Sequence, residues 1–243
     1  MNENIITTFD EINSVKLVQP STGPRVNMDS VLLASWVKVH SRTSKFLEAG
    51  CASGAVSLLI AKKFIKKDFH ITGFDIQKEL IEIARLNAVI NALDLKANFI
   101  EGDLRDKNLF PRESFDGLVI NPPYSSLAAG RKSDNISSAI ARFELTCNLE
   151  DVGELAFRVL KNKGRLFAVF ASSRLDIFIS AMTEYKIIPK RLMPVYPKIN
   201  ENSGIFLIEC VKNGGESLSF MPPLIIRDEN DNYTSDLLKA YEF

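Results

Sequence analysis

Short apolar runs rich in β-forming residues alternate with helical patterns through most of the chain, from Lys45 onward. This alternation is typical of βα units, in which helices connect the successive strands of a parallel sheet. It predicts an α/β fold with a doubly wound, mostly parallel sheet and helices on both faces. The seven expected strands are residues 45–49, 70–74, 97–100, 117–120, 165–170, 186–192 and 205–211, and residues 222–226 are a candidate edge strand.

Apolar residues at helical spacing predict the helices between these strands. Four apolar residues between Leu80 and Ala88 recur at spacings of three and four, which indicates one buried helical face. Another helix is expected to begin after Asn148, a favourable N-cap residue, and to end at Gly164. Further helices are expected at 55–64 and from about residue 173.

The segment before Lys45 does not follow this rhythm, although residues 28–39 have a helical pattern. We expect residues 1–44 to form a cap segment over the ligand site, and residues 45–243 to form the core of one domain that spans 1–243. The connection at 125–147 is longer than the usual few residues, and loops of that size are commonly functional. We therefore expect it to be an insertion that faces the substrate.

Composition is that of an ordinary globular protein, with 46% hydrophobic and 25% charged residues. No stretch approaches the roughly eighteen consecutive apolar residues of a membrane span, and residues 1–10 carry Asp and Glu where a signal peptide carries Lys or Arg. We therefore expect a cytoplasmic location and no membrane partner. Cys51, Cys147 and Cys210 are odd in number and far apart, which favours free, mostly buried thiols and no metal site. Thirty basic residues balance thirty acidic ones, so net charge neither predicts nor excludes a nucleic-acid partner.

Three successive strands end in residues suited to binding an adenosine. Residues 48–54 (EAGCASG) follow the first strand, where doubly wound sheets bind ligands, but they lack the spacing of a dinucleotide fingerprint. Asp75 ends the second strand, where its carboxylate can accept both ribose hydroxyls. At the end of the third strand, Asp103 can accept from the adenine amino group and Leu104 can donate its backbone N–H to a ring nitrogen. The glycine loop alone is equally a tight turn, and each acidic residue alone is more often a solvated carboxylate at a strand end, but their combination favours the adenosine.

This order resembles the class I methyltransferases, whose first motif is an acidic residue followed by spaced glycines. The resemblance implies a Rossmann-like fold and S-adenosylmethionine as the cofactor. That family usually has Gly where Ala52 stands. The residues expected to bind the cofactor are Asp29, Glu48, Gly50, Cys51, Ser53, Gly54, Asp75, Ile76, Asp103, Leu104 and Asn121.

Asn121, Pro122, Pro123 and Tyr124 directly follow the fourth expected strand. An exocyclic amino group on a purine is a poor nucleophile because its lone pair is delocalised into the ring. The Asn121 side-chain oxygen and the Pro122 carbonyl can accept both amino hydrogens, and the two prolines hold these acceptors in place. Tyr124 offers an aromatic face for a base removed from its stack. An Asn-Pro turn that merely leaves the strand is the alternative, and the setting favours a catalytic role for these four residues.

Several stretches outside the catalytic loop carry a narrower resemblance. They are LVQP at 17–20 through DSVLLA at 29–34, Gly130-Arg131, ARFE at 141–144, LED at 149–151, PVYP at 194–197, and PPLII at 222–226 before Tyr233-Thr234. With these stretches, most of the chain resembles the bacterial tRNA1(Val) (adenine-37 N6)-methyltransferases, although Phe143 and Tyr196 stand where histidine is common in that family. The resemblance implies methyl transfer to N6 of an adenine in the anticodon loop of a tRNA, and we expect a monomer or weak dimer.

Cations near the long loop and in the sixth strand suit contacts with RNA phosphates. The expected substrate-binding residues are Tyr124, Arg131, Lys132, Arg142, Lys190 and Arg191. For any single lysine the alternative is a solvated surface charge, which is our interpretation of Lys62, Lys63, Lys66 and Lys67.

Several substrates remain open on the catalytic loop alone, because it fits amino groups of rRNA bases, DNA adenine and protein glutamine as well as tRNA adenine. A non-catalytic RNA-binding module is the alternative of another class. A nicotinamide oxidoreductase is disfavoured because the third glycine of its fingerprint is missing.

Overall fold

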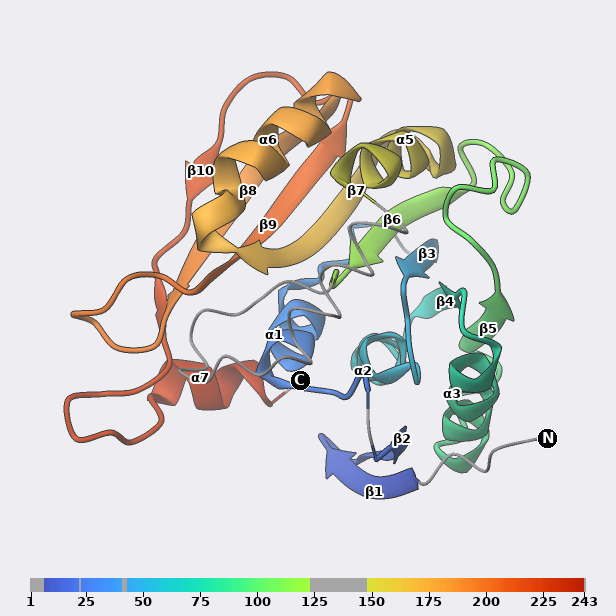
Figure 1. Cartoon of the computed structure of the whole chain (residues 1–243), viewed down its shortest axis with the longest axis horizontal. Helices are drawn as coiled ribbons and strands as arrows, with labels where there is room; N and C mark the ends of the chain where they lie inside the picture. Colours follow the sequence, from blue (N-terminus) through green and yellow to red (C-terminus); the bar gives the residue numbers. More distant parts are fainter. Residues whose placement is uncertain (1–6, 22, 41–42, 123–147, 243) are drawn as a thin grey trace.

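A twisted central sheet organises the computed structural model, which describes residues 7–21, 23–40, 43–122 and 148–242 (Figure 1). Its nine strands run in the order β10-β8-β9-β7-β6-β3-β4-β5, with β11 also beside β8. All neighbouring strands are parallel except β9, which is antiparallel to both β7 and β8. The long strands are β3 (Thr43–Ala49), β4 (Asp68–Asp75), β5 (Ala97–Glu101), β6 (Phe115–Ile120), β7 (Leu160–Ala171), β8 (Ile187–Tyr196) and β9 (Ile205–Lys212).

These seven strands confirm the predicted fold class. The sheet is extended along β8 by two short strands, β10 (Ser219–Phe220) and β11 (Leu224–Ile225). The second of these lies within the proline-containing run that was expected to form an edge strand. Prolines are tolerated there because one side of an edge strand makes no ladder bonds.

Helices cover both faces of the sheet and enclose two apolar cores (Figure 1). One face carries α1 (Met28–Trp36), α2 (Ala55–Lys63), α3 (Lys78–Ile90) and the short α7 (Ser235–Ala240). The other carries α5 (Leu149–Val159) and α6 (Leu175–Glu184), which follows the 3-10 turn η1 (Ser172–Arg174). Side chains alternate across the sheet, so Phe46 enters the first core and Leu47 the second. This two-sided burial explains why a central strand such as β6 is an apolar run, whereas β5 at the edge of the sheet alternates buried and exposed residues.

The start of α5 was predicted correctly and its end was not. Asn148 caps the helix in a reciprocal capping box with Asp151. The helix ends at Val159, and Leu160 already begins β7, so Gly164 lies inside the strand. The pairing of β7 with β6 shifts register here, and Lys163 has a positive φ of 63°. The glycine therefore belongs to an irregular start of the strand and does not cap the helix.

A β-hairpin precedes α1 and was not predicted. Its strands β1 (Thr7–Ile12) and β2 (Val15–Pro20) are joined by Asn13 and Ser14, both with positive φ, as in a type I′ turn. The usual signal for that turn is Asn-Gly, and serine in the second position weakens it.

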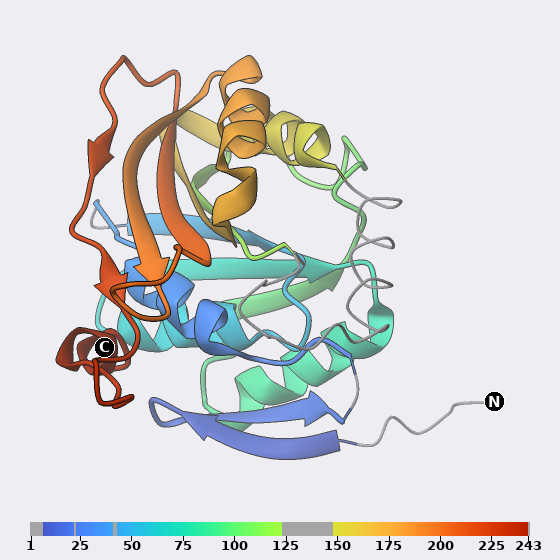
Figure 2. The same ribbon diagram turned by 60° about the vertical axis from the view of Figure 1, so that its left-hand side comes forward.

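The hairpin packs beside α3 (Figure 2), and the side-chain amides of Asn87 in the helix and of Asn91 at its C-cap bind β2. Asn91 exchanges two hydrogen bonds with the backbone of Lys16, at 2.8 and 2.7 Å. Asn87 does the same with Val18, at 2.8 and 2.9 Å, and also donates to the carbonyl of Ser53 at 2.9 Å. One fully buried amide thus joins the hairpin to the loop after β3.

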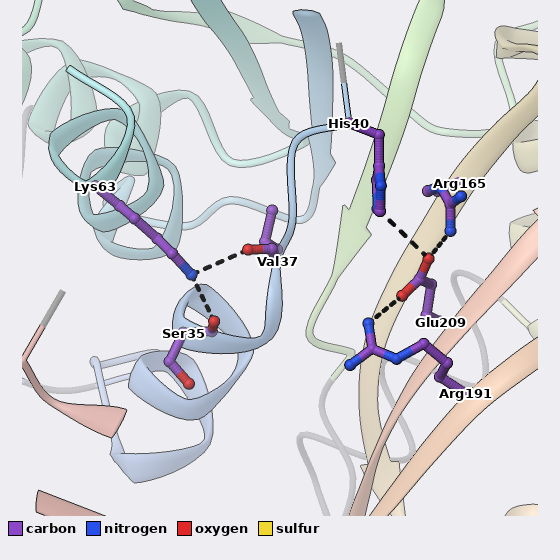
Figure 3. Close-up of polar contacts among 7 residues, drawn as sticks. All are labelled: Ser35, Val37, His40, Lys63, Arg165, Arg191 and Glu209. Carbon is purple, nitrogen blue, oxygen red and sulfur yellow. Dashed lines mark hydrogen bonds and ion pairs between the residues drawn. The ribbon is translucent and has the colours of Figure 1, made fainter. Parts of the chain in front are cut away.

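The interpretation of the lysine-rich run at 62–67 as solvated surface is wrong for Lys63. Its ammonium group donates to the carbonyls of Ser35 and Val37 at the end of α1 (Figure 3), and also to the carbonyl of Ala34. The last carbonyls of a helix have no partner within the helix, and a cation there satisfies them. Lys66 in the same run is exposed, as expected.

Three further sequence expectations concern thiols, metals and membranes. Cys51 and Cys210 are free and buried, which confirms that expectation for two cysteines, while Cys147 lies outside the described residues. Within the described part of the chain, no group of three or more His, Cys, Asp or Glu side chains is placed to hold a metal ion. None of the helices formed by the described residues is long and apolar enough to cross a membrane.

Candidate functional site

The candidate site lies where neighbouring strands end at the carboxyl edge of the sheet. β3 lies between β4 and β6, and its last residue, Ala49, is in register with Phe74 and Ile120. Asp75 and Asn121 come next on those two strands, so they flank the loop that leaves β3. The fold thereby brings together the cofactor and catalytic segments that the sequence predicts.

The two glycines of the loop after β3 have different roles. Gly50 has φ +69°, and a Cβ added there would meet nothing within 4 Å, so its backbone faces open space. Gly54 has φ +82°, and a Cβ there would lie 2.7 Å from the ring of Phe99. Gly50 therefore leaves room for a ligand, whereas Gly54 is required for packing of the loop against β5.

Ala52, which stands where class I methyltransferases usually have Gly, also adopts the left-handed conformation, with φ +45°. A side chain in this region costs roughly 1–2 kcal/mol. Its backbone N–H donates to Asp75 Oδ2 at 3.0 Å, which helps to hold the strained turn. The preference for glycine at this position therefore has a backbone origin.

Asp75 is a buried acceptor that connects two loops. Its second oxygen, Oδ1, accepts from the backbone N–H of Gln77 at 2.9 Å, and the residue is 8% exposed. The Gln77 side-chain amide also lies 3.5 Å from Oδ1, whereas Oδ2 has the single donor Ala52 and keeps a lone pair for a ligand hydroxyl. The neighbouring Ile76 is 55% exposed and offers an apolar surface beside that carboxylate. This arrangement fits the ribose and base of an adenosine.

Glu48 lies near the end of β3, just before the loop, and is 2% exposed. It accepts a short hydrogen bond from the Ser57 hydroxyl, in the first turn of α2. Gly54, at the N-cap position of that helix, has no side chain to cap it, so Glu48 satisfies this terminus instead. Burial raises the pKa of Glu48 from 4.5 to about 8. The Ser57 partner was missed in the sequence because small residues on a buried helix face carry no distinctive pattern.

The raised pKa of Glu48 makes stability depend on pH. Between about pH 5 and pH 8 the folded protein holds this proton and the unfolded chain releases it, so the free energy of unfolding falls as pH rises. The slope approaches about 1.4 kcal/mol per pH unit. We expect Glu48→Gln, which cannot ionise, to flatten the stability curve in this range. Urea denaturation of both proteins at several pH values measures the difference, and parallel curves would contradict the prediction.

Asp103 has an intramolecular partner that the sequence reasoning did not anticipate. The Arg105 guanidinium group holds its carboxylate, with Nε 3.0 and 3.1 Å from the two oxygens. The hydrogen bond to this guanidinium lowers the pKa of Asp103. The role of Asp103 and Leu104 toward an adenine therefore stays a prediction, and it requires lone pairs of Asp103 that Arg105 does not occupy.

Arg158 of α5 supports the same loop and was also missed. Its guanidinium group is buried and donates to the carbonyls of Lys107 and Asp106, at 2.7 and 3.3 Å. These carbonyls belong to the segment between β5 and β6 that carries Asp103. Arg158 therefore connects the outer helix to one wall of the candidate cofactor site.

Asn121 lies at the end of β6 and contacts the first turn of α1. Its Nδ2 donates to Ser30 Oγ at 3.3 Å, and Pro122 beyond it is buried. Asp29 precedes Ser30 on the helix, so this turn of the N-terminal segment is at the site. The segment from 123 to 147 lies outside the described residues, and with it Pro123, Tyr124, Arg131, Lys132 and Arg142.

Lys190 and Arg191 do not join the candidate site. They lie on β8, and β9 and β7 separate this strand from β6. The Lys190 ammonium group donates to the carbonyls of Gly215, Glu216 and Ser217. The expectation that these two cations bind substrate is therefore not supported by their position.

Arg191 belongs to a separate ionic cluster on β7, β8 and β9. Its Nη1 lies 2.7 Å from Glu209 Oε2, and Arg165 binds the other oxygen of this fully buried carboxylate (Figure 3). The guanidinium carbon of Arg191 also lies 4.3 Å from the ring centre of Trp36. His40 approaches Glu209 at 3.9 Å, but burial lowers the pKa of His40, which favours its neutral form.

Comparison with known proteins identifies the class. Residues 40–211 match the family model described as a methyltransferase domain, which is more than half of the chain. A solved structure described as a predicted O-methyltransferase from Agrobacterium tumefaciens superposes with a TM-score of 0.69 at 19% identity, covering 88% of this chain and 95% of that one. The chain belongs to the methyltransferase-domain family and has the class I fold. It is an S-adenosylmethionine-dependent methyltransferase.

Curated relatives confirm the narrower resemblance seen in the sequence. A protein of Aeromonas salmonicida named tRNA1(Val) (adenine(37)-N6)-methyltransferase is 26% identical over 163 residues, 67% of this chain and 66% of that protein. The protein of the same name from Aliivibrio salmonicida is 22% identical over 222 residues, 89% of this chain and 88% of that protein.

The residues at the sheet edge fit the cofactor. Gly50 leaves open space beside the buried acceptor Asp75, and Ile76 provides an apolar surface next to it. We propose that these residues hold S-adenosylmethionine, with Asp75 accepting from the ribose hydroxyls and Ile76 contacting the adenine. When bound, this cofactor supplies a sulfonium-activated methyl group.

Proposed function

We propose that this chain methylates the exocyclic N6 of an adenine in the anticodon loop of a tRNA in the cytoplasm, A37 of tRNA1(Val) by analogy with its relatives. The names of the relatives support the tRNA and the nucleotide. The observation that carries the chemistry is the position of Asn121, one strand away from the loop that contains Gly50. At this position, its side-chain amide flanks the place where a cofactor methyl group would lie.

In this proposal Asn121 and Pro122 act through hydrogen-bond acceptors. The Asn121 oxygen and the Pro122 carbonyl each accept one amino hydrogen, which localises the nitrogen lone pair and directs it away from the ring. The nitrogen would bond to the methyl carbon as the S–CH3 bond breaks, S-adenosylhomocysteine would leave as a neutral thioether, and the excess N–H proton would then pass to solvent. Alignment of the two reacting groups supplies most of the rate, so no strong general base is needed. Tyr124 is proposed to stack on the extruded base.

Other amino groups are the second candidate substrates. An rRNA base, DNA adenine or a protein glutamine presents a similar conjugated nitrogen to the same acceptors. The relatives named for tRNA favour the first assignment, and the position of Asn121 beside the loop that contains Gly50 favours catalysis over a non-catalytic RNA-binding role.

A methyl-transfer assay with radiolabelled S-adenosylmethionine separates these substrates. Bulk tRNA, rRNA, DNA and protein are offered separately, and nucleosides of the labelled RNA are analysed by mass spectrometry. We expect label in tRNA as N6-methyladenosine. Transfer only to protein, rRNA or DNA would contradict the assignment, and cofactor-dependent transfer to none of the four would contradict the enzymatic role.

A further inference from the structure

The side chain of Asn121 is oriented by a chain of hydrogen bonds that begins at the N-terminus of α1. Asn27 caps this helix, and its Oδ1 accepts from the backbone N–H of Ser30 at 3.0 Å. A backbone N–H can only donate, so Asn27 must present its oxygen there and not its amino group. This bond therefore sets the orientation of the first amide without ambiguity.

The Ser30 hydroxyl connects the oriented amide of Asn27 to the amide of Asn121. Its oxygen lies 3.0 Å from the same Asn27 Oδ1, which can only accept, so the hydroxyl proton is directed toward Asn27. Ser30 Oγ is then left as an acceptor for its other polar neighbour among the described residues. That neighbour is Asn121, whose Nδ2 lies 3.3 Å away. Ser30 is 5% exposed, so water does not readily replace Asn121 as the partner of its hydroxyl.

We propose that Ser30 is a positioning residue that sets the amide of Asn121 with its nitrogen toward α1 and its oxygen toward the substrate. This inference rests on the proposed function, in which the oxygen of Asn121 accepts an amino hydrogen. In the reversed orientation the amide would present N–H groups to the donors of the substrate amine, and the methylation geometry would be lost. Ser30 acts only through Asn121 and does not touch the reacting atoms.

The local structure allows a clean test, because the helix cap does not require the hydroxyl. Ser30→Ala retains the backbone N–H that binds Asn27, so α1 keeps its N-cap. Ser30→Thr retains a hydroxyl at the same place. Ser35→Ala is a matched control on the same helix, since the Ser35 hydroxyl donates only to the carbonyl of Leu32 among the contacts described, at 2.8 Å.

We expect Ser30→Ala to lower kcat about five- to tenfold, the value of one oriented hydrogen bond. The dissociation constant for S-adenosylmethionine and the thermal midpoint should stay close to those of the wild type. Ser30→Thr should restore at least half of kcat, and Ser35→Ala should leave it unchanged. Equilibrium binding, steady-state kinetics at saturating tRNA and thermal unfolding supply the three readouts.

Replacement of Asn121 by aspartate extends the test. A carboxylate has two equivalent oxygens and no amide to turn, so Ser30→Ala should change kcat less than twofold in an Asn121→Asp background. The proposal is overturned if Ser30→Ala keeps kcat within twofold of the wild type, or if cofactor binding falls by the same factor as kcat. The wild type is assayed alongside. An inactive wild type therefore signals failure of the proposed function, and an active one with an unaffected Ser30→Ala variant signals failure of this inference alone.

Discussion

Asn121→Ala is expected to reduce methyl transfer about 100- to 1000-fold, the usual cost of removing one preorganised polar group from a reacting centre. The alanine variant loses the acceptor that draws out the amine lone pair, whereas the loop around Gly50 and the carboxylate of Asp75 remain. S-adenosylmethionine binding should therefore change by no more than a few-fold. Single-turnover transfer to tRNA and calorimetric titration of the cofactor measure the two quantities separately.

A second asparagine, away from the site, serves as the control for the effect of replacing any asparagine by alanine. Asn98 is exposed on β5 and is away from the carboxyl edge of the sheet, so Asn98→Ala should keep full activity. Normal methylation by Asn121→Ala would show that the proposed mechanism is wrong. A parallel loss of cofactor binding would assign Asn121 to the cofactor site alone.

Glu209→Ala is expected to lower the free energy of unfolding by about 3–5 kcal/mol, because breaking a buried ion pair leaves uncompensated charge. The Glu209 side chain is completely buried, and it binds Arg165 and Arg191 with its two oxygens. Removing it leaves two guanidinium groups side by side, with side chains only 31% and 21% exposed. Urea denaturation of the two proteins at neutral pH measures the effect.

Asp231→Ala provides the matched control for this ion cluster. Asp231 pairs with Lys198 at 2.8 Å, but the two side chains are 64% and 40% exposed, and such surface pairs contribute little to stability because solvent screens the charges. The destabilisation by Glu209→Ala should exceed that of the control severalfold. Equal effects would mean that the two arginines find other partners or reach solvent once the carboxylate is gone.

Much of the core fold was accessible from sequence because the central strands of the sheet are buried on both faces over most of their length. Strands such as β7 and β9 therefore form continuous apolar runs, and the ends of β3, β4 and β6 carry the polar residues of the site. The order of those strands in a doubly wound sheet then predicts that their ends converge. Sequence reasoning could place Asp75 and Asn121 near one another for this reason alone.

Charged and polar residues that turn inward were not accessible in the same way. Lys63 lies in a lysine-rich run that looks solvated, and its partners are backbone carbonyls of another helix, which leave no trace in composition. Arg191 was interpreted as a phosphate ligand from the cations in its own strand. Its acidic partner, Glu209, lies on the neighbouring antiparallel strand, further along the sequence. Which strands become neighbours is decided by tertiary packing, so the charge of one strand alone did not reveal the pair.

The N-terminal segment was the least predictable part, although one signal was present. Asn27 directly precedes a helical pattern, which is the ordinary mark of an N-cap. Ser30 carries no such mark, because its contact with Asn121 joins residues that are 91 positions apart in the chain. Long-range hydrogen bonds of this kind depend on the complete fold.

Asn87 in α3 and Asn91 at its C-cap also fix the register at which β2 packs on the helix. Residues four apart on a helix are separated by about 6 Å along its axis, and alternate residues of a strand by about 6.6 Å, so two amides match two backbone groups of β2. A slip of β2 by one residue would turn every side chain to the opposite face. Asn87 also donates to the carbonyl of Ser53, in the loop after β3. The same side chain therefore fixes the position of β2 relative to the candidate cofactor loop. The start of α1 follows β2 in the chain, so a one-residue slip of β2 against the two asparagines should shift the start of α1 away from Asn121, whereas an insertion in the turn would displace only β1.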